Sequence, residues 1–191
     1  MMMTKLKKWP EKDDRFRELI LYVCQKCATD PKFGATKLNK ILYFSDFLAY
    51  AELEEPITGF EYQRLPNGPA PRRMIPIRDQ MIKKGDLGSQ VVPLKGGRTQ
   101  HRLVNLRVPD LSVFTAEQIS LADRVIAELW DLDAEAVSDL SHRIMGWKFA
   151  DVNETIPYET VFISSEPLTE VDVQRARELG RLVHEPTSND H

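Results

Sequence analysis

The part of this sequence that most restricts the fold is residues 59–76, GFEYQRLPNGPAPRRMIP, which hold four of the chain's twelve prolines. Each proline fixes its own φ angle and lacks a backbone N–H, and it biases the preceding residue toward extended conformations. The segment therefore cannot form one helix or a strand in the middle of a sheet. We expect a shaped loop, and because loops of this length often carry function, it is a candidate binding segment.

Apolar residues recur at three- and four-residue spacing before this loop and predict two helices there. The first covers residues 13–28, with Asp13 or Asp14 placed to cap its start. The second covers residues 36–53 and carries two neighbouring apolar stripes. Because so wide an apolar face has to be covered on two sides, we expect the second helix to be the central one.

The chain after the loop is predicted to form a helix and then a β-hairpin. The helix is expected from about residue 72 to residue 84 and to end at a glycine. Two β-favouring runs, 89–94 and 100–108, flank a Lys-Gly-Gly-Arg turn and predict the hairpin. Pro93 places its first strand at an edge or a bulge.

Helices are also predicted in the last third of the chain. Thr115 opens a capping-box pattern, Thr-Ala-Glu-Gln, before a helix that reaches residue 130. An aspartate can cap a shorter helix over 133–142, and a threonine can cap a last helix over 169–182. Residues 145–165, between these two, are interrupted by glycine and proline and are expected to be irregular or partly extended.

Length and composition fit one domain of 191 residues and 22.0 kDa. We expect a flexible N-terminus over residues 1–12, a single domain over 13–183 and a disordered tail over 184–191. No apolar run approaches the roughly 20 residues of a membrane span, and no apolar region follows the first lysines, so a cytoplasmic location without a membrane partner is expected. The predicted fold class is α+β, predominantly α-helical, a compact helical domain with a small antiparallel β-hairpin.

No group of residues in the sequence has the spacing of a catalytic, cofactor or metal site. The proline-rich segment lacks the features of a phosphate loop, and there is no GxSxG motif. Ser141 and His142 are helix neighbours that point about 100° apart, which does not suit a catalytic pair. Cys24 and Cys27 form a CxxC, but the histidines lack ligand spacing, so two partly buried cysteines are expected, with a zinc or redox role as the alternative. We predict that the protein is not an enzyme and needs no cofactor.

Charge is distributed unevenly along the chain. Residues 1–59, 60–110 and 111–191 carry net charges of +1, +6 and −10. In the basic segment, the predicted helix and hairpin resemble in outline the last helix and wing of a winged-helix module. A DNA-binding regulator is therefore the alternative function, although nucleic acid is the less expected partner. Its candidate phosphate contacts are Arg72, Arg73, Arg78, Lys83 and Lys84.

Several short strings, in one order, resemble those of a known family. Residues 37–46, KLNKILYFSD, look like its helix motif, and residues 56–69, with PITG, a tyrosine and PNGP, look like its loop. Residues 141–158, with SH, GW and IPY, look like its closing region. The family is the Panacea domain, that is, the SocA-like antitoxins, which are also described as phage-associated or genetic-element proteins. The resemblance spans roughly residues 16–165, and Ala70 departs from it where the family commonly has valine.

The resemblance implies a mainly helical domain that acts as the antitoxin of a two-gene toxin–antitoxin system. Members bind and neutralise different toxins, and a SocA-type member is a proteolytic adaptor that delivers its toxin to a ClpXP protease. The implied partners are therefore a cognate toxin and a ClpXP-type protease. The proline-rich segment is expected to cross the central helix, either as a rigid recognition surface or as a crossover buried against the core. The candidate partner-binding residues are Lys37, Lys40, Tyr43, Tyr62, Asn67, Gly68, Pro69 and Trp147.

Three of the residues in these motifs carry separate expectations. Lys37 and Lys40 are placed on the polar side of the central helix and are expected to be solvated unless a partner covers them. Trp147 is predicted to belong to the core in preference to an interface. His142 is expected to be a satisfied hydrogen-bonding residue and not a metal ligand.

Overall fold

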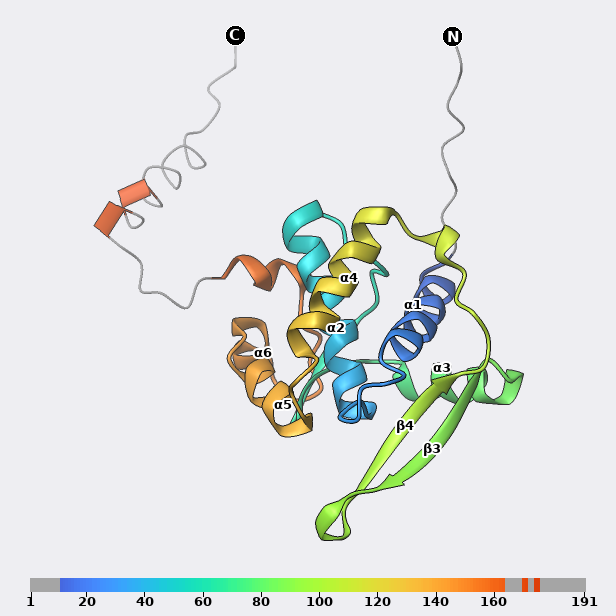
Figure 1. The fold of residues 1–191 in the computed structure, drawn as a ribbon. Helices are drawn as coiled ribbons and strands as arrows, with labels where there is room; N and C mark the ends of the chain where they lie inside the picture. Colours follow the sequence, from blue (N-terminus) through green and yellow to red (C-terminus); the bar gives the residue numbers. More distant parts are fainter. Residues whose placement is uncertain (1–10, 164–169, 172–173, 176–191) are drawn as a thin grey trace, which may run out of the picture.

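The computed structural model describes residues 11–163, 170–171 and 174–175. Within these residues the chain forms a helical body from which one β-hairpin projects, as Figure 1 shows. The elements in chain order are α1 (Lys12–Lys26), α2 (Ala35–Leu53), β1 (Tyr62–Leu65), β2 (Gly68–Pro71), α3 (Met74–Lys84), β3 (Leu87–Pro93), β4 (Thr99–Asn105), α4 (Ala116–Leu129), α5 (Ala134–His142) and α6 (Met145–Phe149), with short 3-10 turns η1 (Lys95–Gly97), η2 (Leu111–Val113) and η3 (Tyr158–Phe162).

Three of the predicted segments fall largely outside the described residues. The expected tail over 184–191 lies outside the described residues, and so does most of the expected N-terminus, although Lys12 already belongs to α1. Of the helix expected over 169–182, residues 170–171 and 174–175 are described, and they are helical. Within the described residues, no helix is both long enough and apolar enough to cross a membrane.

Helix α2 is the centre of the fold, as its two apolar stripes predicted. It packs against α1, α4, α5, β2 and η3, and in Figure 1 α4 crosses it from the front. Side chains around most of its circumference are buried, among them Leu38, Ile41 and Leu42. The core therefore forms around α2, and the other elements close it from several sides.

Helix α1 is present, but the prediction for its start was wrong. It begins at Lys12, with Glu11 as its N-cap and no side-chain capping bond. Asp13 and Asp14 lie in the first turn, where carboxylates interact favourably with the exposed N–H groups of the helix. The far end of the helix is held by Arg102 of β4, which donates hydrogen bonds to the carbonyl groups of Cys27, Ala28 and Asp30.

The proline-rich segment forms a hairpin, which corrects the expectation of a loop. In the pair β1–β2, Pro71 lies opposite Tyr62 and Pro69 lies opposite Arg64. The backbone groups of Tyr62 and Arg64 instead bond to residues 153–156 on the other side of β1, where Tyr62 accepts one hydrogen bond and Arg64 both donates and accepts. Pro69 and Pro71 are tolerated in β2 because the β1 residues opposite them direct their N–H and C=O groups away from β2. At these two positions a proline therefore costs no hydrogen bond between the strands.

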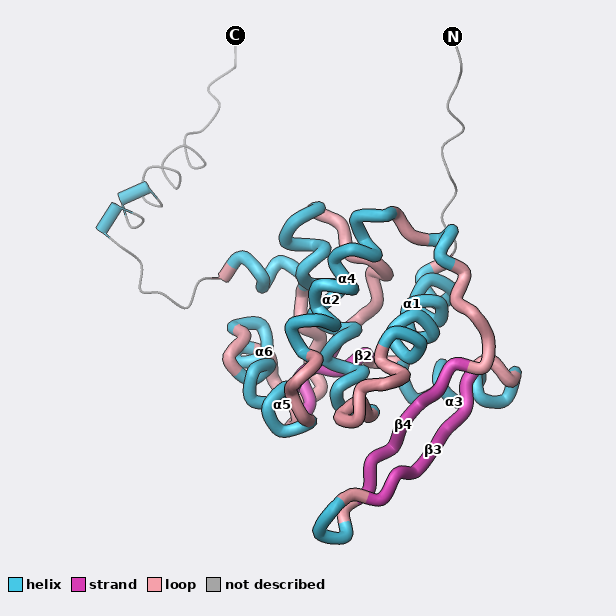
Figure 2. The backbone as a smooth tube through the Cα atoms, in the orientation of Figure 1, coloured by secondary structure: helices cyan, strands magenta, loops and turns pink. Residues whose placement is uncertain are grey.

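The second hairpin, β3–β4, agrees with the sequence prediction. Its strands pair in register from Leu87 with Asn105 to Pro93 with Thr99. Gly96 and Gly97 take positive φ angles at the turn, and Pro93 ends its strand at the far end of the pair. Figure 2 shows both strands of this hairpin extending away from the helices. The fold class is thus α+β and mostly helical, and the described part of the chain contains two antiparallel strand pairs where one was expected.

The last third of the chain is more helical than predicted. Asp133 caps α5, as expected, by accepting hydrogen bonds from the N–H groups of Glu135 and Ala136. The expectation that residues 145–165 are irregular was wrong in part, since they contain α6 and η3. Both elements have only five residues, which is too short to produce a recognisable apolar period.

Replacing Thr115 by Ala is expected to lower the free energy of unfolding by about 1 kcal/mol. Thr115 Oγ1 accepts from the N–H of Gln118 at 3.2 Å, and Gln118 Oε1 accepts from the N–H of Thr115 at 3.1 Å. The alanine leaves the N–H of Gln118 without this partner, whereas Thr115→Ser keeps the hydroxyl. Urea denaturation of both variants measures the effect, and an equal loss in the two would contradict a role for the cap.

Candidate partner-binding site

Most of the candidate binding residues lie inside the protein. Asn67 is exposed and Trp147 is half-buried. The other six are buried: Lys37, Lys40, Tyr43, Tyr62, Gly68 and Pro69. Six of the eight come together where β1–β2 crosses α2, because Lys40 lies against residues 67–69 and Tyr43 packs edge-on against Tyr62.

Lys40 connects α2 to the turn between β1 and β2. Its side chain is only 2% exposed, and its ammonium donates to the carbonyl oxygens of Asn67 at 2.6 Å and Pro69 at 2.9 Å. Burial lowers the pKa of Lys40 to about 8. The expectation of a solvated lysine was wrong, because the β1–β2 turn covers it.

Gly68 allows the turn to approach α2 this closely. Its φ angle of 92° lies in the region that favours glycine. A methyl group at this position would overlap Ser141 Oγ and lie 2.6 Å from Lys40 Nζ. Ser141 Oγ donates to the carbonyl of Ser138, so its part in this arrangement is packing beneath the turn.

Lys37 is buried in the same way, one turn earlier on α2. Its ammonium lies 2.7 Å from Asp30 Oδ2, an ion pair without the alignment of a hydrogen bond, and both side chains are 1% exposed. It also donates to the carbonyl oxygens of Trp130 at 2.6 Å and Leu132 at 2.9 Å. Lys37 therefore joins α2 to the α1–α2 loop and to the α4–α5 loop, and the prediction that it is solvated was wrong.

Asp46 is a central buried residue that was not among the predicted site residues. It accepts from the N–H of Thr58 at 2.6 Å, from Thr58 Oγ1 at 2.5 Å and from Tyr62 Oη at 2.7 Å. Burial raises the pKa of Asp46, and these hydrogen bonds oppose the rise. Tyr62 Oη is also 2.9 Å from the carbonyl of Leu42. Spacing could have revealed Asp46, since it stands four residues after Leu42 on the apolar face of the predicted helix.

Spacing could also have revealed both lysines. Lys37 and Lys40 precede Phe44 by seven and four residues, and so continue the apolar stripe of Phe44, Phe47 and Ala51 toward the start of α2. Together with Asp46, they fix three segments that are remote in sequence against one helix. This arrangement favours the interpretation of the proline-rich segment as a crossover held against the core.

The half-buried Trp147 contacts two other side chains, those of Arg64 and His142. The guanidinium carbon of Arg64 lies 4.4 Å from the centroid of the Trp147 ring, a cation–π contact. The ring of His142 stacks on the Trp147 ring, with 4.2 Å between the two centroids. Trp147 Nε1 donates to the carbonyl of Leu65 at 3.0 Å. The expectation of a hydrogen-bonded His142 was wrong, since its buried Nε2 has no hydrogen-bond partner among the described residues. Trp147 packs against the core and remains partly open to solvent.

An apolar groove runs along the side of α2. Its volume is about 510 Å³, and α2, α4, α5 and η3 contribute its walls. The lining residues include Phe44 and Leu48 of α2, Val125 of α4, Leu140 of α5, and Ile144, which directly precedes α6. We name this feature the α2–α4–α5 groove. Sequence reasoning did not identify it, because it forms only when three helices come together.

The arginines of the basic segment are mostly engaged within the protein. Arg72 donates to Asn153 and Thr155, Arg73 pairs with Asp13, and Arg107 pairs with Glu18 and Asp86. Lys83, Lys84 and Arg98 form no ion pair with the residues that the structure describes. Asp13 and Glu18 are the two carboxylates from outside the segment that form ion pairs with it among the described residues, so they offset only part of its charge of +6. The arginines held in these contacts are less available to DNA phosphates.

The two cysteines are buried free thiols. Burial raises the pKa of Cys27 to about 12, with a further contribution from Asp30, and burial also raises the pKa of Cys24. Thiols with such raised pKa values react slowly, because the thiolate is the reactive form. Among the described residues, no three His, Cys, Asp or Glu side chains are grouped as metal ligands.

The titration of Lys40 predicts how stability depends on pH. Because burial lowers the pKa of Lys40 to about 8 in the folded protein, the unfolded chain, with a pKa of about 10.4, binds more protons above pH 8. The free energy of unfolding should therefore rise with pH through this group, by about 2 kcal/mol between about pH 7.5 and about 9.5. Urea denaturation across this pH range gives the free energy of unfolding of the wild type and of Lys40→Met, and the difference between the two isolates the contribution of Lys40. A difference that does not change with pH would contradict the prediction.

One comparison with known proteins identifies a relationship. The family model described as "Antitoxin SocA-like, Panacea domain" matches residues 38–148. These residues include Lys40, the β1–β2 turn, Trp147 and most of the groove. No curated protein and no solved structure matches the chain significantly.

Proposed function

This chain belongs to the SocA-like antitoxins with a Panacea domain, and we propose that it neutralises a cognate toxin by binding the toxin protein directly. The observation that carries the proposal is the family match, which covers more than half of the chain. Binding of this kind is stoichiometric and involves no turnover. The proposed location is the cytoplasm, a compartment that suits two free cysteines.

The geometry supports a scaffold that presents a fixed surface. Lys37, Lys40 and Asp46 hold loops from distant parts of the sequence at set positions, and a preorganised surface loses little entropy when it binds. Among the predicted contact residues, Asn67 and Trp147 are the two that a partner can reach without a rearrangement. We therefore assign the buried six a positioning role and keep Asn67 and Trp147 as proposed contacts.

Co-purification tests the proposal. The tagged protein is recovered from its native cells at moderate salt, treated with nuclease and analysed by mass spectrometry. We expect one stoichiometric partner, encoded by an adjacent gene, that arrests growth when it is expressed alone and is harmless when this chain is co-expressed. Recovery of only nuclease-sensitive DNA would overturn the proposal in favour of a DNA-binding regulator. In that case charge reversal at Lys83, Lys84 and Arg98 should abolish the DNA retention.

Measuring the lifetime of the toxin in cells distinguishes two routes to neutralisation. If binding alone occludes the toxin, the toxin persists in cells that also produce this chain. If the chain is a proteolytic adaptor, the toxin disappears rapidly, and deletion of the ClpXP-type protease restores it. Persistence of the toxin would assign occlusion, and a protease-dependent loss of the toxin would assign delivery.

A further inference from the structure

We propose that the toxin binds mainly in the α2–α4–α5 groove, in addition to the contacts proposed for Asn67 and Trp147, and that the groove accepts an amphipathic α-helix of the toxin with an apolar face and flanking Lys or Arg residues. The inference rests on the proposed function, which supplies the partner. It goes beyond that function because it names the surface and the chemistry of the segment that occupies it.

The shape of the groove suits a helix. Its long walls are helices, and its lining residues on α2 and α4, Phe44 with Leu48 and Val125 with Leu129, are each four residues apart. Side chains at this spacing lie on one face of each helix, so both rows line the groove along its length. A helix bound in such a groove is anchored by apolar residues at three- and four-residue spacing.

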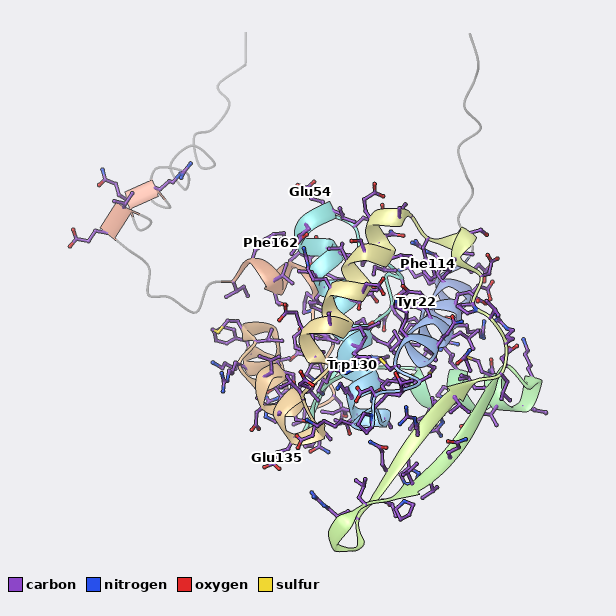
Figure 3. The ribbon with its side chains drawn as sticks, viewed as in Figure 1. Tyr22, Glu54, Phe114, Trp130, Glu135 and Phe162 are labelled. Carbon is purple, nitrogen blue, oxygen red and sulfur yellow. The ribbon has the colours of Figure 1, made fainter. Side chains whose placement is uncertain are left out.

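Apolar side chains also remain exposed around the groove. Leu140 is 38% exposed and Phe162 is 64% exposed. Phe162 packs against Tyr50 of α2, and in Figure 3 it lies at the same end of the molecule as Glu54, which ends α2. Exposed apolar side chains beside an apolar groove are typical of a protein interaction site.

The charge around the groove selects a basic partner. Residues 111–163, which supply two of its helical walls, carry ten acidic and three basic side chains. Arg124 lies at the groove but is paired with Glu52, whereas Glu128 lines the groove and has no ion pair among the described residues. Glu159, on η3, accepts a hydrogen bond from Tyr50 near the same end of α2. Flanking Lys or Arg residues on the bound helix would therefore be attracted and acidic residues repelled.

Fluorescence anisotropy with two defined peptides tests the chemistry of the site. One labelled peptide is an amphipathic Leu/Lys helix, and the other has the same pattern with Glu in place of Lys. The full chain is expected to bind the Leu/Lys peptide at least about tenfold more tightly than the Leu/Glu peptide. Equal binding of the two, or binding of neither, would overturn the proposal.

Matched variants locate the binding. Leu140→Glu is expected to weaken binding of the Leu/Lys peptide by about tenfold or more. Glu128→Lys should weaken that peptide and strengthen the Leu/Glu peptide. The controls are Val91→Glu, at a 60% exposed position on the projecting hairpin, and Glu61→Lys, at an exposed position before β1. If the controls weaken binding as much as the groove variants do, the site lies elsewhere, and circular dichroism verifies that all four variants are folded.

Repeating the toxin co-purification with the same variants separates the two proposals. Loss of the toxin in Leu140→Glu, with retention in Val91→Glu, supports the groove as its site. Retention of the toxin in both variants leaves the antitoxin function standing and overturns the groove. Peptide binding without any toxin partner overturns the function and the assigned occupant. Light scattering tests whether a second copy of the chain occupies the groove instead. Self-association of the wild type that is lost in Leu140→Glu would assign the groove to that second copy and overturn the proposal.

Discussion

Replacing Lys37 by Met is expected to lower the free energy of unfolding by about 3–5 kcal/mol, because the substitution leaves the carboxylate of Asp30 buried without its counter-charge. The carbonyl oxygens of Trp130 and Leu132 also lose their donor. Methionine has nearly the same length as the lysine stem, so the packing against α2 is largely kept. Urea denaturation followed by circular dichroism measures the change.

Two further variants test whether the loss of stability comes from the unpaired buried carboxylate or from removing any lysine. Lys26→Met removes an exposed ion pair with Asp123, and we expect a change below about 1 kcal/mol. In the double variant Asp30→Asn with Lys37→Met neither member of this pair is charged, so part of the lost stability should return. If the double variant is as unstable as the sum of the single variants, the hydrogen bonds to the two loops would account for the effect instead of the ion pair.

The sequence predicted the helices well because their apolar periods are long. The spacing over 36–53 identified α2 almost to its bounds, and the Thr115 and Asp133 caps marked the starts of α4 and α5. The β1–β2 hairpin was missed for a physical reason. Prolines usually argue against a strand, and here they fit only because β1 directs its Tyr62 and Arg64 backbone groups to residues 153–156.

The candidate site was harder to predict than the fold. A lysine on a helix is ordinarily solvated, and Lys37 and Lys40 are buried because the α4–α5 loop and the β1–β2 turn cover them. These covering segments are remote in sequence, so no local pattern reports their position. For the same reason the motif residues were assigned to partner contact, although six of the eight lie inside the protein.

Replacing Gly68 by Ala is expected to lower the free energy of unfolding by about 4 kcal/mol or more, since two penalties combine. The first is backbone strain, because a residue with a Cβ atom rarely adopts the φ angle of 92° found here. The second is overlap with Ser141 Oγ and the Lys40 ammonium, which would separate the ammonium from the carbonyl groups of Asn67 and Pro69. A buried cation would then be left without acceptors. Thermal and urea denaturation measure the loss.

Gly85→Ala is the matched control, because it carries the strain without the overlap. Gly85 ends α3 at a φ angle of 80°, and no atom lies within 4 Å of the position that a Cβ would take. This variant is expected to lose only about 1 kcal/mol. The difference between the two variants therefore measures how tightly the turn is held against Lys40 and Ser141. If both lose the same amount, the turn is free to move away from α2, and the buried residues beneath it would not have the positioning role proposed for them.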